Sequence, residues 1–515
     1  DSRINPADKN NEAIRLACQK GHVDVVRLLL ADSRINPADN SNAAIRWACN
    51  NGHIDIVRML LADGRVNPAD SNNLAIRWAC AHGHLDIVRL LLADRRVNPA
   101  DKNNTAIREA CWGGHIDVVR LLLDDNRVNP ADENNAAVIQ ACSNGNVNVV
   151  RLLLNDNRVN PADQNNKPVL CACENGHLEV VCLLLADHRV NPSVCEAIRW
   201  TCGYGHVDVV RLLLTDNRNH PAIHHNEPIR LACTYGHVDV VRLLLADSRV
   251  NPADCNNFAV RWACANSHRE VVRLLLADAR VNPADQNNEA IQFACAQYHV
   301  DIVRLLLADS RVNPADCNNM AIRLACKYGN VDVVRLLLVD SRVNPTDCDN
   351  DAIRDACEKG HIDVVRLLLA DNRVNPAEKN NSAMRLACKH DHVEILCLLL
   401  MDSRVDIPHA VSTCSEIVEK YGEDESIRAL LALGGIEPYR IMYGALDPKV
   451  HNLGRLRYWQ RTSFINLYKQ GDEFRNGPYG ILLRHRLRIA DLYKSTVLTS
   501  KLPVEVIELV LECMS

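Results

Sequence analysis

The stretch from Asp1 to Ala31 reads DSRINPADKNNEAIRLACQKGHVDVVRLLLA, and the same pattern returns from Asp32, from Asp63 and onward through most of the 515 residues. One proline marks each repeat at every thirty-first position, at Pro6, Pro37, Pro68, Pro99, Pro130 and Pro161. Self-similarity at this period predicts stacked supersecondary units, each touching only its neighbours, and not a single globular core.

Each repeat is predicted to contain two helices joined by a tight turn. The apolar residues of the first helix share one face, at Ala13, Ile14, Ala17 and Cys18. Asn11 is predicted to cap the N-terminus of this helix, because its side chain can accept a hydrogen bond from a backbone N–H. Gly21 can adopt the left-handed turn that ends the helix. The second helix spans residues 22–31, and its buried side is formed by Val23, Val26, Leu29 and Leu30.

The segment that links one repeat to the next, called the finger below, is DSRINPADKN in the first repeat. An Asp and an Arg two residues apart recur in the fingers of all thirteen full repeats, as at Asp32 and Arg34. This uniformity predicts one turn geometry, with the turn backbone clamped by the Asp or the Arg side chain. Pro168 and Pro228 stand in the place of Ala13, which supports a helix start there, because proline is tolerated in a first helical turn.

The pattern is interrupted in three places, which we predict to be the weakest joints. One finger, NPSVCEAIRW, is two residues short, so that Pro192 and Pro221 lie closer together in sequence than the prolines of regular repeats. The next finger reads NRNHPAIHHNEP and departs from the pattern. The turn glycine is replaced by Ser267, Tyr298 and Asp391, where a β-carbon in a left-handed conformation costs about 1–2 kcal/mol.

Thirteen of the 22 cysteines share one position of the repeat. They are Cys18, Cys49, Cys80, Cys111, Cys142, Cys173, Cys202, Cys233, Cys264, Cys295, Cys326, Cys357 and Cys388. Equivalent residues of adjacent repeats should lie about 8–10 Å apart, whereas the Cα atoms of a disulfide lie about 4.4–6.8 Å apart. We therefore expect free, buried thiols and a reducing, cytoplasmic compartment.

Charge and hydropathy argue against several classes of partner. The formal net charge is −5, which does not indicate nucleic-acid binding. No apolar run approaches the ~18 residues that cross a membrane, and the N-terminus shows no apolar signal segment. The chain opens inside the repeat pattern and without Met, so we expect further residues before Asp1.

No group of residues predicts a metal, cofactor or catalytic site. One histidine in each repeat, as at His22, cannot converge on one ion when the repeats are about 9 Å apart. The arginines at the positions of Arg15 and Arg27 indicate an ion-paired face more than a phosphate site, because Asp24 stands beside Arg27. Zinc binding and relaxed sequence are alternatives for the His and Cys residues near the irregular fingers, which are Cys171, Cys173, Cys182, Cys195, His220, His224 and His225.

The centre of the repeat, AIRLACQKGHVDVVRLLL, resembles the ankyrin repeat. The family pattern TPLHLAA…GH…VV.LLL is matched at Ala17, Gly21, His22, Val25, Val26 and Leu28 to Leu30. This repeat is slightly shorter than the family's, because its finger is shorter, and Arg15 stands where the family has His. The resemblance implies an all-α ankyrin-repeat solenoid of helix–turn–helix units with short extended fingers. It also implies that the end of the first helix lines a concave face that binds proteins.

Three regions are predicted along the chain. Residues 1–402 hold thirteen repeats, and residues 403–433 form a divergent fourteenth repeat that caps them. Gly422 supports this assignment, because it stands one full period after Asp391, the turn position of the thirteenth repeat. Residues 434–515 leave the pattern, and their amphipathic segments predict a small helical C-terminal region.

The predicted partner-binding residues are those at which the repeats differ from one another. They lie at the positions of Gln19 and Lys20, near the end of the first helix, and at those of Lys9 and Glu12. Trp and Tyr are the expected anchors, because these residues dominate interface hot spots. Drift at solvated positions is the alternative. The predicted contacts are Lys20, His82, Trp112, Tyr204, Tyr235, Phe258 and Tyr328.

Large aromatic residues share the position of Leu16 in five other repeats, at Trp47, Trp78, Trp200, Trp262 and Phe293. That position also tolerates Glu109 and Asp355, so it cannot be fully buried. We predict that these aromatic side chains pack between repeats.

The chain ends in LPVEVIELVLECMS, and residues 502–514 resemble the first helix of an F-box. Ankyrin proteins of large DNA viruses carry a comparable truncated element, so the resemblance implies contact with a ubiquitin-ligase adaptor. An ordinary amphipathic helix is the alternative. The matching residues are Leu502, Pro503, Glu505, Val506, Val510 and Leu511.

The sequence therefore predicts a protein–protein interaction scaffold that is not an enzyme and holds no cofactor or metal. The alternative function is the substrate-recognition subunit of an SCF-type ubiquitin ligase. An enzyme with its chemistry in the C-terminal region is a third hypothesis, but no motif links the candidates Cys513, His451 and His485.

Overall fold

The computed structural model describes residues 7–190, 195–216, 219–413 and 416–421, together with 424 and 427. Within these residues every regular element is an α-helix, which confirms the all-α prediction. The predicted helical C-terminal region, residues 434–515, lies outside the described residues, as does its F-box-like helix. None of the described helices has the length and apolar character that crossing a lipid bilayer requires.

The apolar spacing of the sequence produces a first and a second helix in each repeat. The first helices are α1 (Asp8–Lys20), α3 (Asp39–Asn50), α5 (Asp70–Ala81), α7 (Asp101–Gly113), α9 (Asp132–Ser143), α11 (Asp163–Glu174), α13 (Cys195–Tyr204), α15 (Ile223–Tyr235), α17 (Asp254–Ala265), α19 (Asp285–Ala296), α21 (Asp316–Lys327), α23 (Asp347–Lys359) and α25 (Glu378–Lys389). The second helices are α2 (Val23–Ala31), α4 (Ile54–Ala62), α6 (Leu85–Ala93), α8 (Ile116–Leu123), α10 (Val147–Leu154), α12 (Leu178–Ala186), α14 (Val207–Thr215), α16 (Val238–Ala246), α18 (Arg269–Ala277), α20 (Val300–Leu307), α22 (Val331–Val339), α24 (Ile362–Ala370) and α26 (Val393–Met401).

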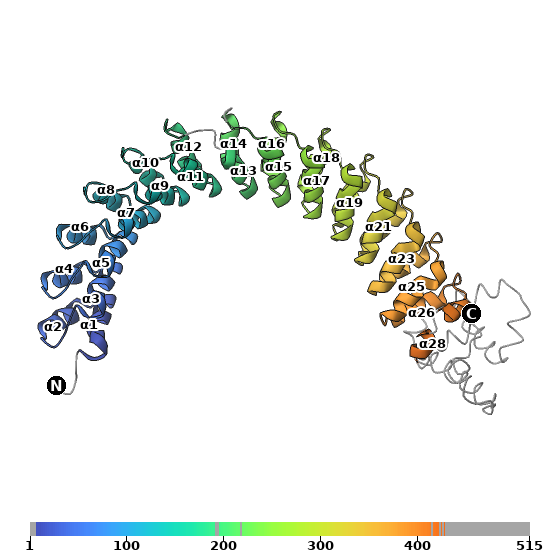
Figure 1. Cartoon of the computed structure of the whole chain (residues 1–515), viewed down its shortest axis with the longest axis horizontal. Helices are drawn as coiled ribbons and strands as arrows, with labels where there is room; N and C mark the ends of the chain where they lie inside the picture. The colour runs from blue at the N-terminus through green and yellow to red at the C-terminus, as the bar shows by residue number, and fades with distance from the viewer. Residues whose placement is uncertain are drawn as a thin grey trace, which may run out of the picture. The chain divides into compact units, whose positions relative to one another are not determined.

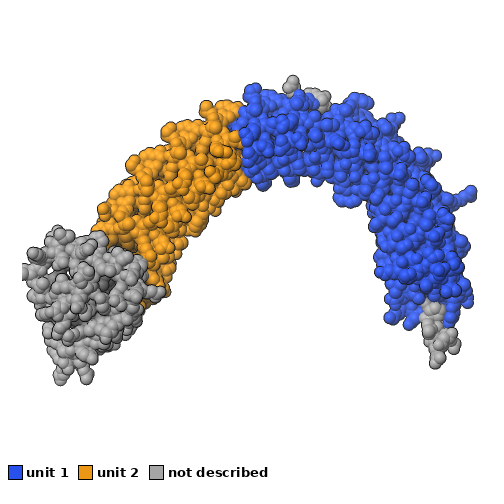
Figure 2. All heavy atoms as spheres, turned by 180° about the vertical axis from the view of Figure 1, so that it is seen from behind, with its two compact units in different colours: residues 1–259 blue, residues 260–515 orange. Residues whose placement is uncertain are grey.

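Residues 1–259 and residues 260–515 form two compact units, which are coloured separately in Figure 2. Within each unit the first helices lie side by side in one row and the second helices in another (Figure 1). One face of the first-helix row is therefore left uncovered by the second helices. That face is the part of each unit that can present varied side chains.

The hydrophobic core runs between the two rows of helices. In an interior repeat, Ile76 and Cys80 of α5 and Val88 and Leu91 of α6 have no exposed surface. Burial of an aliphatic side chain of this size stabilises the fold by about 1.5–3 kcal/mol. The thirteen equivalent cysteines are all free and buried, as predicted. Desolvation raises the pKa of the Cys18 thiol to about 12, so the thiol stays neutral at physiological pH.

The turn between the two helices favours glycine for two reasons. Gly21 has a φ of +79°, and a β-carbon there would lie 2.6 Å from the imidazole of His53 in the next repeat. That imidazole also packs over the end of α1, where its Nε2 lies 3.1 Å from the carbonyl oxygen of Gln19. The histidines are thus structural turn residues, as predicted. Ser267, Tyr298 and Asp391 keep the left-handed turn, with φ of 65°, 66° and 63°.

The finger ends in three consecutive left-handed residues, which the sequence analysis did not anticipate. Lys9, Asn10 and Asn11 have φ of 49°, 55° and 55°. Right-handed helical geometry begins only after Asn11, and no side chain caps the N-terminus of α1. The prediction that Asn11 caps its own helix is therefore wrong. Asn tolerates the left-handed region better than most residues, which explains why Asn fills this place.

The Asn11 side chain binds the next repeat instead. Its Nδ2 donates to Asp39 Oδ2 at 2.8 Å, and its Oδ1 accepts from the backbone N–H of Asn36 at 2.9 Å. This pair of bonds is called the asparagine bridge below. It recurs with Asn42, Asn73, Asn104, Asn135, Asn226, Asn288 and Asn319.

The predicted clamp on the finger is confirmed, and both side chains take part. Asp63 Oδ1 accepts from the backbone N–H of Arg65 at 3.0 Å, and the two carboxylate oxygens bind the guanidinium at 2.9 and 2.6 Å. Arg65 Nη1 then donates to the carbonyl oxygen of Ile35, in the preceding finger, at 2.8 Å. The Asp thus shapes its own turn, and the Arg binds that turn to the preceding repeat.

The register predicted for the fourteenth repeat agrees with the residues that the structure describes there. Helices α27 (Ile407–Thr413) and α28 (Glu416–Tyr421) occupy the place of a first helix, in two pieces. The Tyr421 hydroxyl donates to Asp391 Oδ1 at 2.6 Å, and Ile427 is fully buried. The boundaries of this cap at 403 and 433 stay a prediction.

The irregular finger before α15 buries a polar side chain. Asn219 stands where other fingers have a buried valine such as Val97, and it has no exposed surface. Its Nδ2 donates to the carbonyl oxygen of Leu213 at 3.3 Å, but its Oδ1 is buried without a partner among the described residues. An unsatisfied buried acceptor costs about 1–3 kcal/mol. The joint between these two repeats is therefore destabilised by a buried polar atom, which the spacing of the prolines did not reveal.

We expect Asn219→Val to raise the free energy of unfolding by about 1–2 kcal/mol, because it removes the unsatisfied Oδ1 and restores the apolar residue of the other fingers. Urea denaturation followed by circular dichroism measures the change. The matched control is Val97→Asn, which creates the same defect in a regular finger and should lower the unfolding free energy. An unchanged or lower stability of Asn219→Val would contradict the explanation.

The clamps predict a dependence of stability on pH. The hydrogen bonds from Arg65 and Arg96 hold the pKa of Asp63 and Asp94 below the usual range. Because the unfolded-state pKa is about 3.9, the clamps contribute fully above about pH 4, and their contribution is lost as the pH falls through the folded-state pKa. The urea midpoint should therefore drop steeply between pH 4 and pH 2. Asp94→Asn should be less stable at pH 6 and should lose less stability over that interval.

Candidate functional site

The candidate site is the uncovered face of the first helices, called the first-helix surface below. It consists of the residues at the positions of Glu12, Arg15, Leu16, Gln19 and Lys20 in each repeat. Helical geometry produces this face, since Ala17 and Cys18 point into the core while the residues on either side of them reach solvent. The surface is therefore held on a rigid row of helices and not on loops.

Four predicted aromatic anchors are strongly exposed at the ends of first helices. Trp112 lies at the end of α7, Tyr204 ends α13, Tyr235 ends α15, and Tyr328 directly follows α21. Their exposed fractions are 56%, 56%, 60% and 45%, which is unusual for residues of this size. Lys20 and His82 are also exposed at this end of their helices. These six residues are placed where a partner could reach them, and the contact itself stays a prediction.

The seventh predicted contact, Phe258, lies differently. It stands near the start of α17 and is half-buried. The guanidinium carbon of Arg230, in the preceding repeat, lies 5.1 Å from the centre of its ring. Phe258 therefore takes part in packing between repeats as well as contributing to the surface.

The repeats around α13 hold exposed rings in defined positions. Trp200 and Tyr204 stack with their ring centres 6.2 Å apart, and the guanidinium of Arg199 lies over Trp200 at 4.3 Å. Arg199 is in turn fixed by Glu227 of the next repeat, with Nε and Oε2 3.1 Å apart. Because these side chains are already ordered, less conformational entropy is lost when a partner binds them.

Four of the five aromatic residues at the position of Leu16 pack between repeats, as predicted, whereas Trp200 stacks on Tyr204 of its own helix. The rings of Trp47 and Trp78 are 5.2 Å apart, and those of Trp262 and Phe293 are 6.2 Å apart. Trp262 nevertheless keeps 38% of its surface exposed. These residues therefore serve two purposes, because they join neighbouring first helices and add apolar area to the surface.

Sequence analysis missed Tyr298 as a member of the surface. This residue was assigned only a strained turn, yet 60% of its surface is exposed, and its hydroxyl donates to the carbonyl oxygen of Tyr328. The available signal was the replacement of a turn glycine by a large aromatic residue. In the sequence, a tyrosine that merely disrupts the turn looks the same as one that forms part of the surface. Only the position of its side chain in the structure distinguishes the two.

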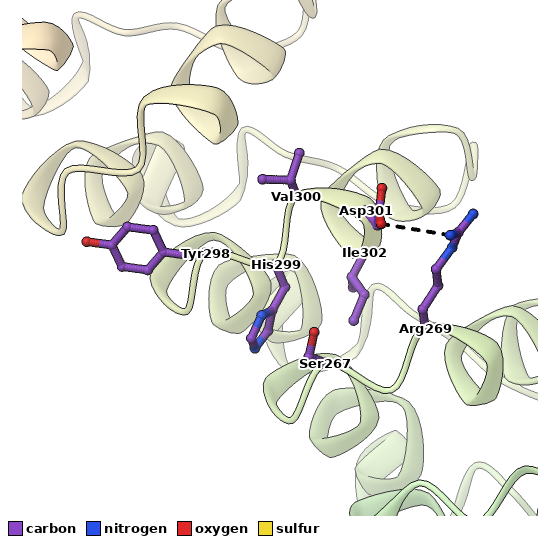
Figure 3. A pocket seen from close by; sticks show the side chains of 7 residues that line it. All are labelled: Ser267, Arg269, Tyr298, His299, Val300, Asp301 and Ile302. Atoms are coloured by element: carbon purple, nitrogen blue, oxygen red, sulfur yellow. Dashed lines mark ion pairs between the residues drawn. The ribbon is translucent and has the colours of Figure 1, made fainter.

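A hollow of about 350 Å³ lies beside Tyr298, between the turns before α18 and α20 (Figure 3). Its lining includes Ser267, His299 and Asp301, the residue types of a hydrolytic triad. His299 Nε2 lies 3.0 Å from the carbonyl oxygen of Ala265, and Asp301 pairs with Arg269 at 3.8 Å. His299 thus makes the same carbonyl contact as His53 and has the structural role of the other turn histidines, and Asp301 is paired with an arginine of the neighbouring repeat and not with this histidine.

The zinc alternative for the irregular fingers finds no arrangement of ligands within the described residues. No group of three or more His, Cys, Asp or Glu side chains that could hold a metal ion is found there. His224 Nε2 lies 3.3 Å from Glu196 Oε1, and His220 Nδ1 accepts from the backbone N–H of Ala222. Cys171 and Cys173 are buried in α11.

Comparison with known proteins shows that models of a known repeat family match most of the chain. The model of the family "Ankyrin repeats (3 copies)" matches residues 2–70, 65–132, 125–195, 260–349 and 322–409, and the model "Ankyrin repeat" matches residues 224–257. No similar protein was found among the curated proteins. A solved structure, the human ASB11 ankyrin repeat domain, is 22% identical, with 36% of this chain and 95% of that chain covered at a TM-score of 0.28.

Proposed function

Because the chain belongs to the ankyrin-repeat family, whose members act as protein-interaction scaffolds, we propose that it binds partner proteins through the first-helix surface. The observation that supports this proposal most directly is the contrast between positions. The core, the turns and the clamps are nearly identical from repeat to repeat, whereas the first-helix surface carries a different set of side chains in each. Large exposed aromatic residues on this varied face favour partner binding over drift at solvated positions.

The chemistry of the surface suits a protein partner. Exposed Trp and Tyr rings, with Arg beside them, are the residues that contribute most to protein interfaces. Tyr204 and Tyr235 occupy the same place in adjacent repeats, on helices that lie side by side. Helix packing separates such residues by about 8–10 Å, so one partner segment can contact both. The proposed role is non-enzymatic, which accords with the usual role of ankyrin-repeat proteins as interaction modules.

The double substitution Tyr204→Ala with Tyr235→Ala tests the proposal. Loss of two anchors should weaken binding of a partner at least ~30-fold, because a hot-spot residue contributes about 2 kcal/mol or more. The full chain, the double variant and a control are used to capture proteins from a eukaryotic lysate, and bound proteins are quantified by mass spectrometry.

The matched control is Arg211→Ala with Arg242→Ala, which alters exposed residues on the second helices of the same two repeats. Partners that bind the first-helix surface should be retained by this control and lost by the tyrosine variant. If all three proteins capture the same partners in equal amounts, the first-helix surface of these repeats does not bind them.

A second function rests on the sequence LPVEVIELVLECM at residues 502–514. Its F-box-like pattern supports a ligase substrate receptor, in which the ankyrin repeats select the substrate and the terminal helix recruits the adaptor. A helix with apolar residues at i, i+3 and i+4 suits binding in a hydrophobic groove.

Deletion of residues 502–515 separates the two functions. For a ligase receptor, adaptor and cullin subunits should be captured by the full chain and should be absent from the deleted chain, while other partners remain. Capture of the same partners by both chains, without any ligase subunit, would leave the scaffold function and remove the receptor function.

A further inference from the structure

The first-helix surface carries an arginine at the position of Arg15 in most repeats, and several of these arginines are paired with the following repeat. The acid that pairs with them stands at the position of Glu12. Arg199 pairs with Glu227 in this way, and Arg323 pairs with Asp351. Arg261 and Glu289 form a third such pair. These guanidinium charges are therefore neutralised within the protein.

Other arginines at this position have no acid in the following repeat, and those of α3, α5 and α7 lie on three consecutive first helices. Their arginines are Arg46, Arg77 and Arg108. The acid of the following repeat is replaced in each case, by Leu74, by Thr105 and by Ala136.

The Nε atoms of all three arginines are buried and have no hydrogen-bond partner among the described residues. Arg46 Nη2 donates to the carbonyl oxygen of Asn40 at 2.8 Å, and Arg108 Nη2 donates to the Thr105 hydroxyl at 2.8 Å. Both of these partners are uncharged. The three guanidinium groups are thus half-buried and incompletely satisfied.

One carboxylate on the same face opposes these charges. Glu109 Oε1 lies 3.9 Å from Arg77 Nη2. The finger aspartates Asp70 and Asp101 stand two turns earlier on the same helices, and both of their carboxylate oxygens are already hydrogen-bonded. Each receives an asparagine side chain of the preceding repeat and its own following backbone N–H. The finger aspartates keep their charge, so these three helices have no net charge as a whole. On the first-helix surface itself, three arginines face one carboxylate, and the excess of positive charge is confined to that face.

Apolar rings lie beside the three arginines. Trp47 and Trp78 follow Arg46 and Arg77 directly in sequence, and their rings are 5.2 Å apart. Trp112, with 56% of its surface exposed, lies in the last turn of α7. The site therefore combines a row of cations with an aromatic strip, all within residues 1–259. The chain as a whole has a net charge of −5, so general attraction of acidic molecules is not expected, and acid binding would have to come from this local excess.

We propose that Arg46, Arg77 and Arg108 form a docking site for an extended acidic segment of a partner protein. The register follows from two spacings. Adjacent helices are separated by about 8–10 Å, and an extended chain in the polyproline II conformation advances about 3.1 Å for each residue and places every third side chain on the same face. Carboxylates three residues apart therefore meet successive arginines, and the apolar residues between them pack on the tryptophan rings. Each carboxylate takes the place that the acid of the following repeat fills elsewhere in the chain. This inference rests on the scaffold function proposed above and names the class of partner for one part of the surface.

A displayed library of random 12-residue peptides, selected on the immobilised full chain, tests the proposal. Enriched peptides should contain Asp or Glu at every third position with apolar residues between them. The variant Arg46→Gln, Arg77→Gln, Arg108→Gln should bind a synthetic copy of the most enriched peptide at least tenfold more weakly, measured by fluorescence polarisation. Circular dichroism confirms that the variant is folded.

The matched control is Arg58→Gln, Arg89→Gln, Arg120→Gln, which removes three exposed charges from the second helices of the same repeats. It should bind the peptide as the unaltered chain does. Equal weakening in both triple variants would assign the effect to net charge and overturn the proposal. Enrichment of peptides without acidic residues, lost on Tyr204→Ala with Tyr235→Ala, would also overturn it while leaving the scaffold function intact. Absence of any enriched peptide would count against both.

Discussion

The asparagine bridge is the interaction on which the regular structure depends. Asn11 adopts a left-handed backbone that disfavours most residues, and in that conformation its side chain satisfies both Asp39 and the backbone of Asn36 in the next finger. The bridge is buried, so its hydrogen bonds do not compete freely with water, and leaving any one of them unmade would cost about 1–3 kcal/mol. Because every bond runs to the following repeat, the bridge couples repeats and does not stabilise one repeat alone. Each bridge thus offsets part of the strain of three left-handed residues with hydrogen bonds to a neighbouring repeat.

Two further contacts also join each repeat to its neighbour. The arginine of each clamp binds the preceding finger, and the turn histidine packs over the preceding glycine. Stability in such an array comes from interfaces between neighbours, so a local defect weakens one joint without unfolding the rest. Asn219 is a defect of this kind, with a buried oxygen in place of a valine side chain. The turn at Tyr298 is another such defect, but there the tyrosine that replaces the glycine also contributes an exposed ring to the surface.

Placing the stabilising contacts in the core, turns and fingers leaves the first-helix surface free to vary. That surface differs along the chain in a way that matters for recognition. On α13 Arg199 is paired with Glu227 and the exposed groups nearby are mainly aromatic rings, whereas the arginines of α3, α5 and α7 have no acid in the following repeat. A single fold can thus offer chemically different sites on successive repeats. The proposed role is recognition by several separate side chains on a row of helices, and recognition of this kind needs no catalytic cluster.

The sequence by itself determined the repeat, the two helices, the buried free cysteines, the glycine turn and a clamp on the finger by its Asp or Arg side chain. Each of these follows from spacing or from residue types that act within about one repeat, which periodicity records directly. The tertiary structure decided what Asn11 does, which arginines are paired and where Phe258 and Tyr298 lie. A side chain that binds a residue 25 to 28 positions away looks the same in sequence as one that caps its own helix, because both require a short polar group at the same place. Only the position of the neighbouring repeat separates the two, and that position is set by packing between repeats.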